Sequence, residues 1–306
     1  MRRSAVIIVL ALAVAACGKS TPVTPAASAT GTFPATITAG NGSVTIAAKP
    51  KRIVSLSPTS TEILFAIGAG AQVIAVDDQS NYPTNAPKTT LSGFEPNVEA
   101  IAGYTPDLVV FADDSKKLSD SFKALKIPAI LHAPAKDLDD AYAQIKALGV
   151  ATGRTGAANA LVDRMRKDIR ELASRAPKPA TTFTYYHELD DHYFSVTSST
   201  FIGKVYALLG LKNIADPADK SGGGYPQLSP EYIIQSNPSL IFLADTKCCS
   251  ITAETVTKRP GWDKIAAVKD AHVVALDDDM ASRWGPRIVD LLRTVSAALE
   301  TLKQAA

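Results

Sequence analysis

The sequence has few of the residues that most often carry catalysis or bind transition metals. Only four histidines and three cysteines occur among its 306 residues. It has no Cys-x-x-Cys pair and no His-Glu-x-x-His pair, so a zinc site is unsupported. It also lacks a Gly-x-Ser-x-Gly turn and both glycine-rich phosphate-binding motifs. These absences argue against the common hydrolases, zinc enzymes and nucleotide-dependent enzymes, and leave another kind of enzyme as a remote alternative.

A strong charge of either sign is also missing. Lysine and arginine together number 32 and aspartate and glutamate 30, for a net charge of +2. Such a balance argues against a nucleic-acid-binding protein, which usually has a strongly basic face. The 46% of hydrophobic and 20% of charged residues are ordinary for a globular chain. Beyond the N-terminus, no apolar run is long enough to cross a bilayer.

The N-terminus has the order of segments that is typical of a secretory signal. Arg2 and Arg3 precede the apolar run AVIIVLALAVAA, which is shorter than the about 20 residues of a transmembrane helix. Small residues then lead to Cys17, an arrangement that resembles a bacterial lipobox. We therefore predict a lipoprotein signal peptide over residues 1–17, with Cys17 as the lipidated residue. The alternative is an ordinary signal peptide with a chance cysteine.

Residues 18–43 are interpreted as a flexible tether, because they begin with GKSTPVTPAASATG and have almost no bulky apolar side chains. A lipidated Cys17 would hold the folded part on the cell membrane, facing the periplasm or the extracellular side.

Beyond the tether, short apolar runs alternate with helical patterns, which is typical of α/β folds with mostly parallel sheets. A longer helical pattern, with apolar residues at Leu161, Met165 and Ile169, separates two such regions. We predict an N-terminal α/β lobe, a connecting helix and a C-terminal α/β lobe, over residues 44–150, 151–178 and 179–306.

Four stretches of the folded part together point to a known family. They are 51–64 (KRIVSLSPTSTEIL), 99–109 (EAIAGYTPDLV), 225–231 (YPQLSPE) and 283–288 (RWGPRI). In order and spacing around one long helix they resemble the periplasmic binding proteins of ABC importers for iron-siderophores, haem and cobalamin. The resemblance is closest to the cobalamin branch.

This resemblance implies two three-layer α/β lobes joined by a single long helix, with the ligand cleft between the lobes. It implies a monomeric binding protein without enzymatic activity or cofactor, which hands a small-molecule ligand to the permease subunits of an ABC importer. A single connecting helix bends less easily than several loop crossings, so we expect only a modest hinge motion on binding.

The family uses one acid on each lobe to dock on arginines of the permease, and the matching positions are Glu99 and Glu231. Each stands at the start of a predicted helix, where an acid is tolerated. The alternative is that each acid only complements a helix dipole.

The resemblance implies a corrinoid ligand that aromatic side chains contact. Tyr82, in the Asn-Tyr-Pro stretch after the second strand, matches an aromatic position that packs against the corrin, and Tyr225 falls where the cobalamin branch often has tryptophan. Phe94 lies near another aromatic position, offset by one residue. For each of the three, the alternative is packing in the core.

Trp284, with Arg283 and Arg287 beside it, is a further candidate for the C-terminal wall of the cleft. Arg259, Arg283 and Arg287 also form a set like those of siderophore-binding relatives, which keeps an iron-siderophore or haem open as the ligand. The run Asp277–Asp279 follows a strand, where it can bind a metal or amides or form a solvated loop.

Cys248 and Cys249 are adjacent, so they form either a vicinal disulfide or two reduced thiols. His187 and His192 stand among three acids, Glu188, Asp190 and Asp191. This cluster favours a hairpin turn over a metal site, and we predict no resident metal.

Overall fold

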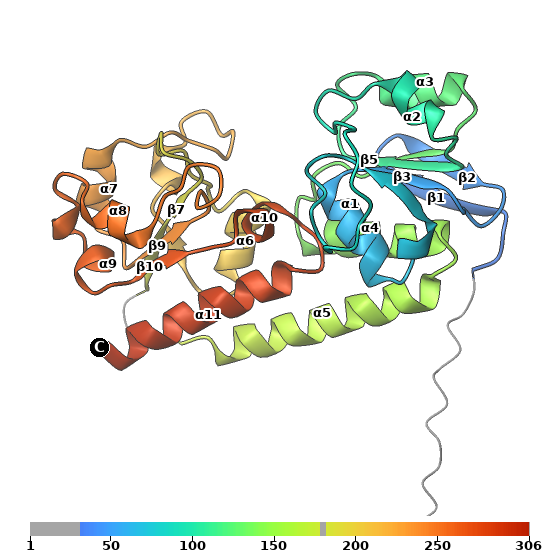
Figure 1. Cartoon of the computed structure of the whole chain (residues 1–306). Helices are drawn as coiled ribbons and strands as arrows, with labels where there is room; N and C mark the ends of the chain where they lie inside the picture. The colour runs from blue at the N-terminus through green and yellow to red at the C-terminus, as the bar shows by residue number, and fades with distance from the viewer. Residues whose placement is uncertain (1–30, 178–181, 306) are drawn as a thin grey trace, which may run out of the picture.

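The computed structural model describes residues 31–177 and 182–305, so the predicted signal peptide with Cys17 lies outside the described residues. Two α/β lobes sit above a pair of long helices (Figure 1). We call residues 31–151 the N-lobe and residues 182–282 the C-lobe. The predicted fold class, two α/β lobes with parallel sheets joined by a long helix, is confirmed. None of the described helices is long and apolar enough to cross a membrane.

The N-lobe is built on a parallel sheet with the strand order β4-β3-β5-β6. Its strands are β3 (Ile53–Leu56), β4 (Val73–Val76), β5 (Leu108–Phe111) and β6 (Ala129–Leu131). Its helices are α1 (Pro58–Ala66), η1 (Gly70–Gln72), α2 (Val98–Gly103), α3 (Leu118–Ala124) and α4 (Leu138–Ala151). Successive strand residues point to opposite faces, so Ile53 packs in the cluster with α1 and α4, and Val54 packs in the cluster with α2 and α3.

A hairpin at the start of the N-lobe corrects the predicted end of the tether. Strands β1 (Ala35–Ala39) and β2 (Gly42–Ile46) pair antiparallel, and Ile37 is buried in the core. The tether predicted over residues 18–43 therefore includes a strand. Small residues flank the single isoleucine, so the segment lacks a strong strand signal, and its packing against α4 supplies the order.

The C-lobe repeats the sheet topology of the N-lobe. Its strands, β7 (Thr184–Glu188), β8 (Lys212–Asn213), β9 (Leu240–Leu243) and β10 (Val273–Ala275), are parallel in the order β10-β9-β7-β8. If the four strands of each parallel sheet are numbered in chain order, both sheets have the strand order 2-1-3-4. The lobe contains α6 (Phe201–Ala207), η2 (Asp216–Ala218), α7 (Pro230–Ser236), α8 (Ala253–Thr257), η3 (Trp262–Lys264), α9 (Ala266–Lys269) and α10 (Asp278–Ser282).

Two long helices run beneath the lobes. The predicted connecting helix is α5 (Thr155–Arg175), shorter than residues 151–178 because the chain turns between α4 and α5 at Gly153, which has a left-handed φ of 68°. The C-terminal helix α11 (Ile288–Ala305) lies alongside α5 (Figure 1). An ion pair of 2.7 Å between Arg293 and Asp168 joins them. The lobes are thus connected by α5 and by the segment that leads into α11.

Candidate ligand cleft

A cavity of about 440 Å³ borders the carboxyl edge of the N-lobe sheet. Open α/β sheets bind ligands at this edge, where the strand order reverses. Here the reversal falls between β3 and β5, and Ser57 and Ala112, which follow these strands, line the cavity. Asp279, Arg283 and Trp284 line its other side. The cavity therefore lies between the N-lobe edge and the C-terminal part of the chain, as a ligand cleft between lobes requires.

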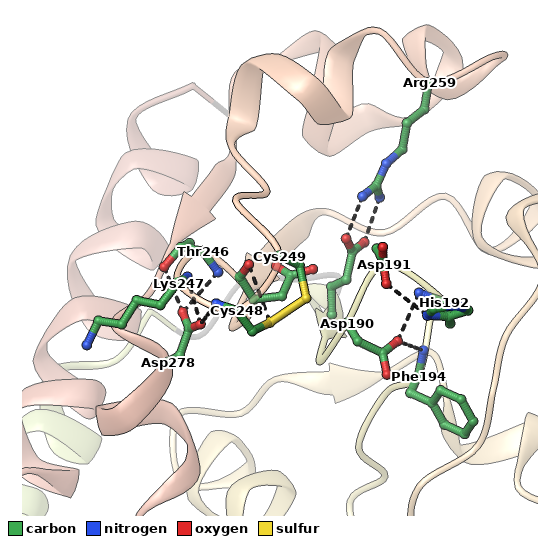
Figure 2. Close-up of a disulfide and its surroundings, with 12 residues drawn as sticks. Asp190, Asp191, His192, Phe194, Thr246, Lys247, Cys248, Cys249, Arg259 and Asp278 are labelled. Atoms are coloured by element: carbon green, nitrogen blue, oxygen red, sulfur yellow. Dashed lines mark hydrogen bonds and ion pairs between the residues drawn. A yellow bond between two sulfur atoms is a disulfide. The ribbon is translucent and has the colours of Figure 1, made fainter. Parts of the chain in front are cut away.

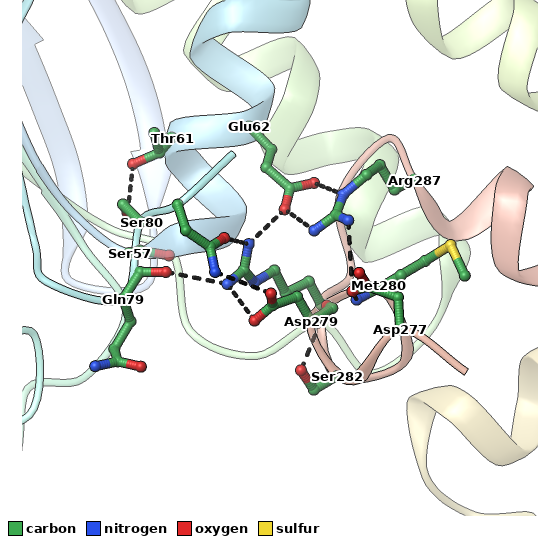
Figure 3. A network of polar contacts seen from close by, with 12 residues as sticks. Ser57, Thr61, Glu62, Gln79, Ser80, Asp277, Asp279, Met280, Ser282 and Arg287 are labelled. Carbon is green, nitrogen blue, oxygen red and sulfur yellow. Dashed lines mark hydrogen bonds and ion pairs between the residues drawn. The ribbon is translucent and has the colours of Figure 1, made fainter. Parts of the chain in front are cut away.

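Local sequence determines how α1 begins at this cavity. Ser57 has an extended backbone and its Oγ accepts a first-turn amide at 3.3 Å, while Pro58 occupies the first helical position. Below it, the Thr61 and Ser80 hydroxyls lie 2.9 Å apart (Figure 3). Ser80 also donates to Asp77 at 2.9 Å. Burial raises the pKa of the Asp77 carboxyl above its usual range, although the hydrogen bond from Ser80 opposes this. The edge thus presents a buried polar layer to the cavity.

One buried acid of α1, Glu62, binds two arginines from the other end of the chain (Figure 3). Arg283 Nη1 donates to Glu62 Oε1 at 2.8 Å, and Arg287 donates to the two Glu62 oxygens at 2.6 and 3.0 Å. Arg283 also donates to Asp279 at 2.7 Å. Both arginines, predicted as ligand contacts, are therefore paired with carboxylates, and they hold the segment 283–287 on the N-lobe.

Phe94 and Trp284, two of the predicted ligand contacts, both line this cavity. Phe94 is 76% exposed. Trp284 is fixed by its indole Nε1, which donates to Gln144 on α4 at 2.8 Å. An aromatic side chain anchored at its polar end leaves a rigid apolar face for packing.

Tyr82 lies outside this cavity. It lines a neighbouring cavity of about 450 Å³ together with Glu62 and Arg287. The Arg287 guanidinium lies 4.5 Å from the centre of the Tyr82 ring, a cation–π contact. The 283–287 segment thus separates Tyr82 from the wall that carries Phe94.

The carboxyl edge of the C-lobe carries two exposed aromatic side chains, Tyr225 at 58% and Phe194 at 37%. They stand on adjacent segments, because Phe194 bridges Gln227 and the Ser195 amide donates to Pro226. Tyr225 was predicted as a ligand contact, whereas Phe194 was not. Neither lines the cavities that contain Phe94 and Tyr82.

A buried pair of acids lies where the strand order of the C-lobe sheet reverses, between β7 and β9. Glu188 ends β7 and Asp245 follows β9, and both are fully buried. Arg259 donates to the two Glu188 oxygens at 2.6 and 2.7 Å (Figure 2). Its guanidinium lies 4.5 Å from the Trp262 ring centre. Burial, together with the nearby Glu188 carboxylate, raises the pKa of Asp245 to about 8. Arg259 is thus already paired, like the other two arginines of the siderophore-type set.

The run Asp277–Asp279 is neither a solvated loop nor an open metal site. Asp277 caps α10, and Lys247 Nζ donates to Asp277 at 2.8 Å and to Asp279 at 2.7 Å. Partial burial is the largest single effect and acts to raise the pKa of both acids, but the hydrogen bonds from Lys247 and other donors and the nearby positive charges together lower the pKa of each. Asp278 accepts backbone amides of the loop after β9. All three carboxylates are therefore already engaged in hydrogen bonds that stabilise the C-lobe edge.

The histidine cluster does not converge on one point. His187 is buried and its Nδ1 lies 2.8 Å from the Tyr206 hydroxyl, while burial lowers its pKa to about 3. His192 is exposed on a turn closed by the Leu189 amide and the Phe194 carbonyl, which confirms the predicted turn. Within residues 31–177 and 182–305, no group of three or more His, Cys, Asp or Glu is arranged to hold a metal ion.

Glu99 and Glu231 occupy equivalent places in the two lobes. Each is the second residue of a short helix, α2 or α7, which precedes the third strand of its sheet. The helices are capped in the same way, by Asn97 and Ser229. Both acids are exposed, and neither makes an ion pair within the described part of the chain.

The sequence matches the family described as periplasmic binding protein over residues 53–280. The chain belongs to the periplasmic binding protein family. It is 32% identical to an uncharacterised ABC transporter substrate-binding lipoprotein, YvrC, of Bacillus subtilis, with 98% of each chain covered. It is 28% identical to a cobalamin-binding protein of Halobacterium salinarum, with 97% of this chain and 84% of the relative covered.

Solved structures agree with the fold of this periplasmic binding protein. A possible iron-binding, periplasmic solute-binding protein of Staphylococcus epidermidis is 28% identical and superimposes with a TM-score of 0.70. The match covers 82% of this chain and 99% of that protein. The chain is thus a substrate-binding protein of the ABC transporter type, and a membrane permease and a small-molecule ligand are the partners of this class.

Sequence reasoning did not single out Glu62, Asp245 or Phe194. Glu62 stands beside Ile63 and Leu64 in α1, and this place in an apolar stretch is a sign of a buried charge. Asp245 follows the apolar strand β9 with no local sign of its neighbour Glu188. Phe194 stands in a loop, and no local pattern indicates that its side chain lies exposed at the C-lobe edge.

Proposed function

We propose that this protein captures cobalamin or a related corrinoid outside the cytoplasm and delivers it to the permease of an ABC importer. The observation that carries the proposal is the combination of exposed aromatic rings on both lobe edges with arginines that are already paired. Phe94 and Tyr225 offer apolar faces on opposite lobes. A corrin ring is broad and carries uncharged amide side chains, so it needs such faces and a few polar anchors.

An iron-siderophore is a less suitable ligand for this cleft. Many ferric siderophores are anionic and require free cationic side chains in the cleft. Arg259, Arg283 and Arg287 each form an ion pair of 2.6–2.8 Å with a buried glutamate. Haem remains the second candidate, because tyrosine can ligate haem iron and Tyr225 is exposed. The Staphylococcus epidermidis relative, described as possibly iron-binding, supports the iron alternative.

Calorimetric titration of the purified protein with cyanocobalamin tests the proposal, with haem and a ferric siderophore in parallel. We expect one-to-one binding of cyanocobalamin, and about a tenfold loss of affinity in Phe94→Ala or Tyr225→Ala because each removes a ring contact. Leu125→Ala is the matched control, since Leu125 is 49% exposed at the end of α3, on the opposite edge of the sheet. Binding of haem alone would transfer the proposal to that ligand, and no binding at all would refute it.

The permease contact is proposed for Glu99 and Glu231. Their equivalent positions in two lobes of the same topology support a symmetric contact, in which each acid meets one basic site. We expect Glu99→Ala and Glu231→Ala to abolish cobalamin uptake by cells while leaving calorimetric affinity unchanged. Glu171→Ala, on the exposed side of α5, is the control that keeps uptake.

The anchor is proposed for Cys17. Its place after an apolar run supports attachment of lipid, and the Bacillus subtilis relative is described as a lipoprotein. Metabolic labelling with a radioactive fatty acid should mark the wild type and not Cys17→Ser, which should leave the membrane fraction. Label in both proteins would exclude Cys17 as the site.

A further inference from the structure

The two adjacent cysteines lie on the C-lobe edge, beside the acid pair. Cys248 and Cys249 are joined by a disulfide in the loop that follows β9 (Figure 2). Cys248 is exposed and Cys249 is half-buried. Because the linked residues are neighbours, the bond closes a small ring that contains the peptide group between them.

This ring adjoins a backbone turn that is held from outside by one carboxylate. Asp278 accepts the amides of Thr246, Lys247 and Cys248 at 2.9, 2.8 and 3.1 Å, and the Thr246 hydroxyl at 2.7 Å. Three successive amides must point to one side to meet a single carboxylate. The disulfide restricts the residue that supplies the third amide, so it favours the conformation that Asp278 binds.

The turn is also linked to the lobe boundary. Lys247 bridges Asp277 and Asp279, and Asp279 in turn accepts a hydrogen bond from Arg283 at 2.7 Å. Arg283 binds Glu62 of the N-lobe. A change in the turn therefore reaches, through α10, the segment that lines the ligand cavity.

On its inner side the turn covers the acid pair. The Cys249 amide donates to the Asp245 carbonyl at 3.2 Å, and the Cys248 sulfur lies 3.7 Å from the same oxygen. The Asp245 side chain is fully buried, and its two carboxyl oxygens have no hydrogen-bond partner among the described residues. A looser turn would admit water to this group.

We propose that Cys248–Cys249 is a reversible thiol–disulfide modification site that sets the order of the C-lobe edge. A dithiol reductant attacks the exposed Cys248 sulfur through its thiolate and releases the Cys249 thiolate. The second thiol of the reductant then displaces Cys248, so the protein gains two electrons and two protons and the reductant becomes a disulfide. The closed ring holds the turn on Asp278, and the open form releases it. The consequence for ligand capture rests on the proposed function.

The chemistry is tested by mass spectrometry of the full chain. Trypsin cleavage after Lys247 and Lys258 gives one peptide with both cysteines. We expect this peptide to resist iodoacetamide in untreated protein and to take two labels after dithiothreitol. Two labels without reductant would overturn the proposal.

Hydrogen exchange tests the structural consequence without any ligand. Reduction should speed amide exchange at residues 246–249 about tenfold or more, because the turn loses its restraint. The double variant Cys248→Ser/Cys249→Ser should exchange like the reduced protein, and Asp278→Asn should speed exchange while the disulfide stays closed. Unchanged exchange on reduction would overturn the proposal.

Titration with cyanocobalamin then separates this proposal from the proposed function. The reduced protein should bind about tenfold more weakly than the oxidised protein. Equal affinity in both states would overturn the link to ligand capture. Absence of cobalamin binding in both states would refute the proposed ligand, and the exchange result would still decide the modification site.

Discussion

The two lobes share one sheet topology but balance charge at their ligand edges in opposite ways. In the N-lobe, one buried carboxylate, Glu62, is shared by two guanidinium groups. In the C-lobe, two buried carboxyl groups, Glu188 and Asp245, lie beside one guanidinium group, that of Arg259. A buried carboxylic acid can keep a proton and become neutral, whereas a guanidinium group cannot lose its charge in a protein.

The origin of the partners differs as well. The arginines that bind Glu62 stand 221 and 225 positions later in the chain, so this contact joins the N-lobe to the segment that leads into α11. Arg259 stands 71 positions after Glu188 and belongs to the same lobe. The N-lobe edge therefore connects the halves of the molecule, and the C-lobe edge is a local structure that protons can adjust.

The largest loss of stability is expected for Glu62→Gln. The change removes the buried carboxylate that two largely buried guanidinium groups share, and breaking a buried ion pair in this way costs about 3–5 kcal/mol. Urea unfolding followed by circular dichroism measures the effect. Glu254→Gln, which removes an exposed i,i+4 pair, should change the unfolding free energy by less than about 0.5 kcal/mol. A loss below about 1 kcal/mol for Glu62→Gln would show that the arginines find other partners.

Arg259→Met is expected to do less damage. Methionine keeps contact with Trp262 and Tyr193, and the buried acid pair, once it has lost the guanidinium group, can respond by binding a proton. We expect a loss of about 2–3 kcal/mol at pH 7 that shrinks at pH 5, measured by urea unfolding at both values. A loss equal to that of Glu62→Gln and independent of pH would remove the distinction between the two lobes.

Most of the fold could be predicted from the sequence because its buried parallel strands are continuous apolar runs. The runs at 53–56, 108–111 and 240–243 are strands in which every residue is buried. The β1 strand was missed because Ala35–Ala39 has one large apolar residue and depends on packing against α4. Tertiary packing, rather than local propensity, orders that segment.

The candidate site could be predicted only in part. Phe94 and Trp284 line one cavity, but Tyr82 lines another, where it contacts Arg287. The pairing of Glu62 with Arg283 spans the chain, and no local pattern encodes which acid an arginine meets. Residue types therefore indicated a cleft, while the pairing of charges within it depends on contacts between distant parts of the sequence.

The proton on Asp245 makes the stability of the folded protein depend on pH. Its pKa is raised in the folded state from 3.8 to about 8, so the folded protein binds more protons than the unfolded chain between these values. Stability attributable to this group is therefore greatest at low pH and falls as pH rises towards 8. Asp245→Asn should match the wild type near pH 4 and become the more stable protein as pH rises, gaining about 1–3 kcal/mol on the wild type between pH 6 and pH 9. Parallel stability curves for the two proteins from pH 6 to 9 would contradict the raised pKa.

The smallest effects are expected where the lobes are most alike, at the caps of the helices that carry Glu99 and Glu231. Asn97 Oδ1 accepts the third helical amide of α2 at 2.9 Å, and Ser229 Oγ accepts the third helical amide of α7 at 3.1 Å. Asn97→Ala and Ser229→Ala should each lower the unfolding free energy by about 1 kcal/mol, since both caps are exposed and make the same bond. Urea unfolding of both variants measures this, with Asn97→Ser and Ser229→Asn as variants that retain a cap. A difference of more than about 1 kcal/mol between the two alanine variants would show that the equivalent helices are stabilised unequally, and would weaken the case for symmetric docking of the two acids.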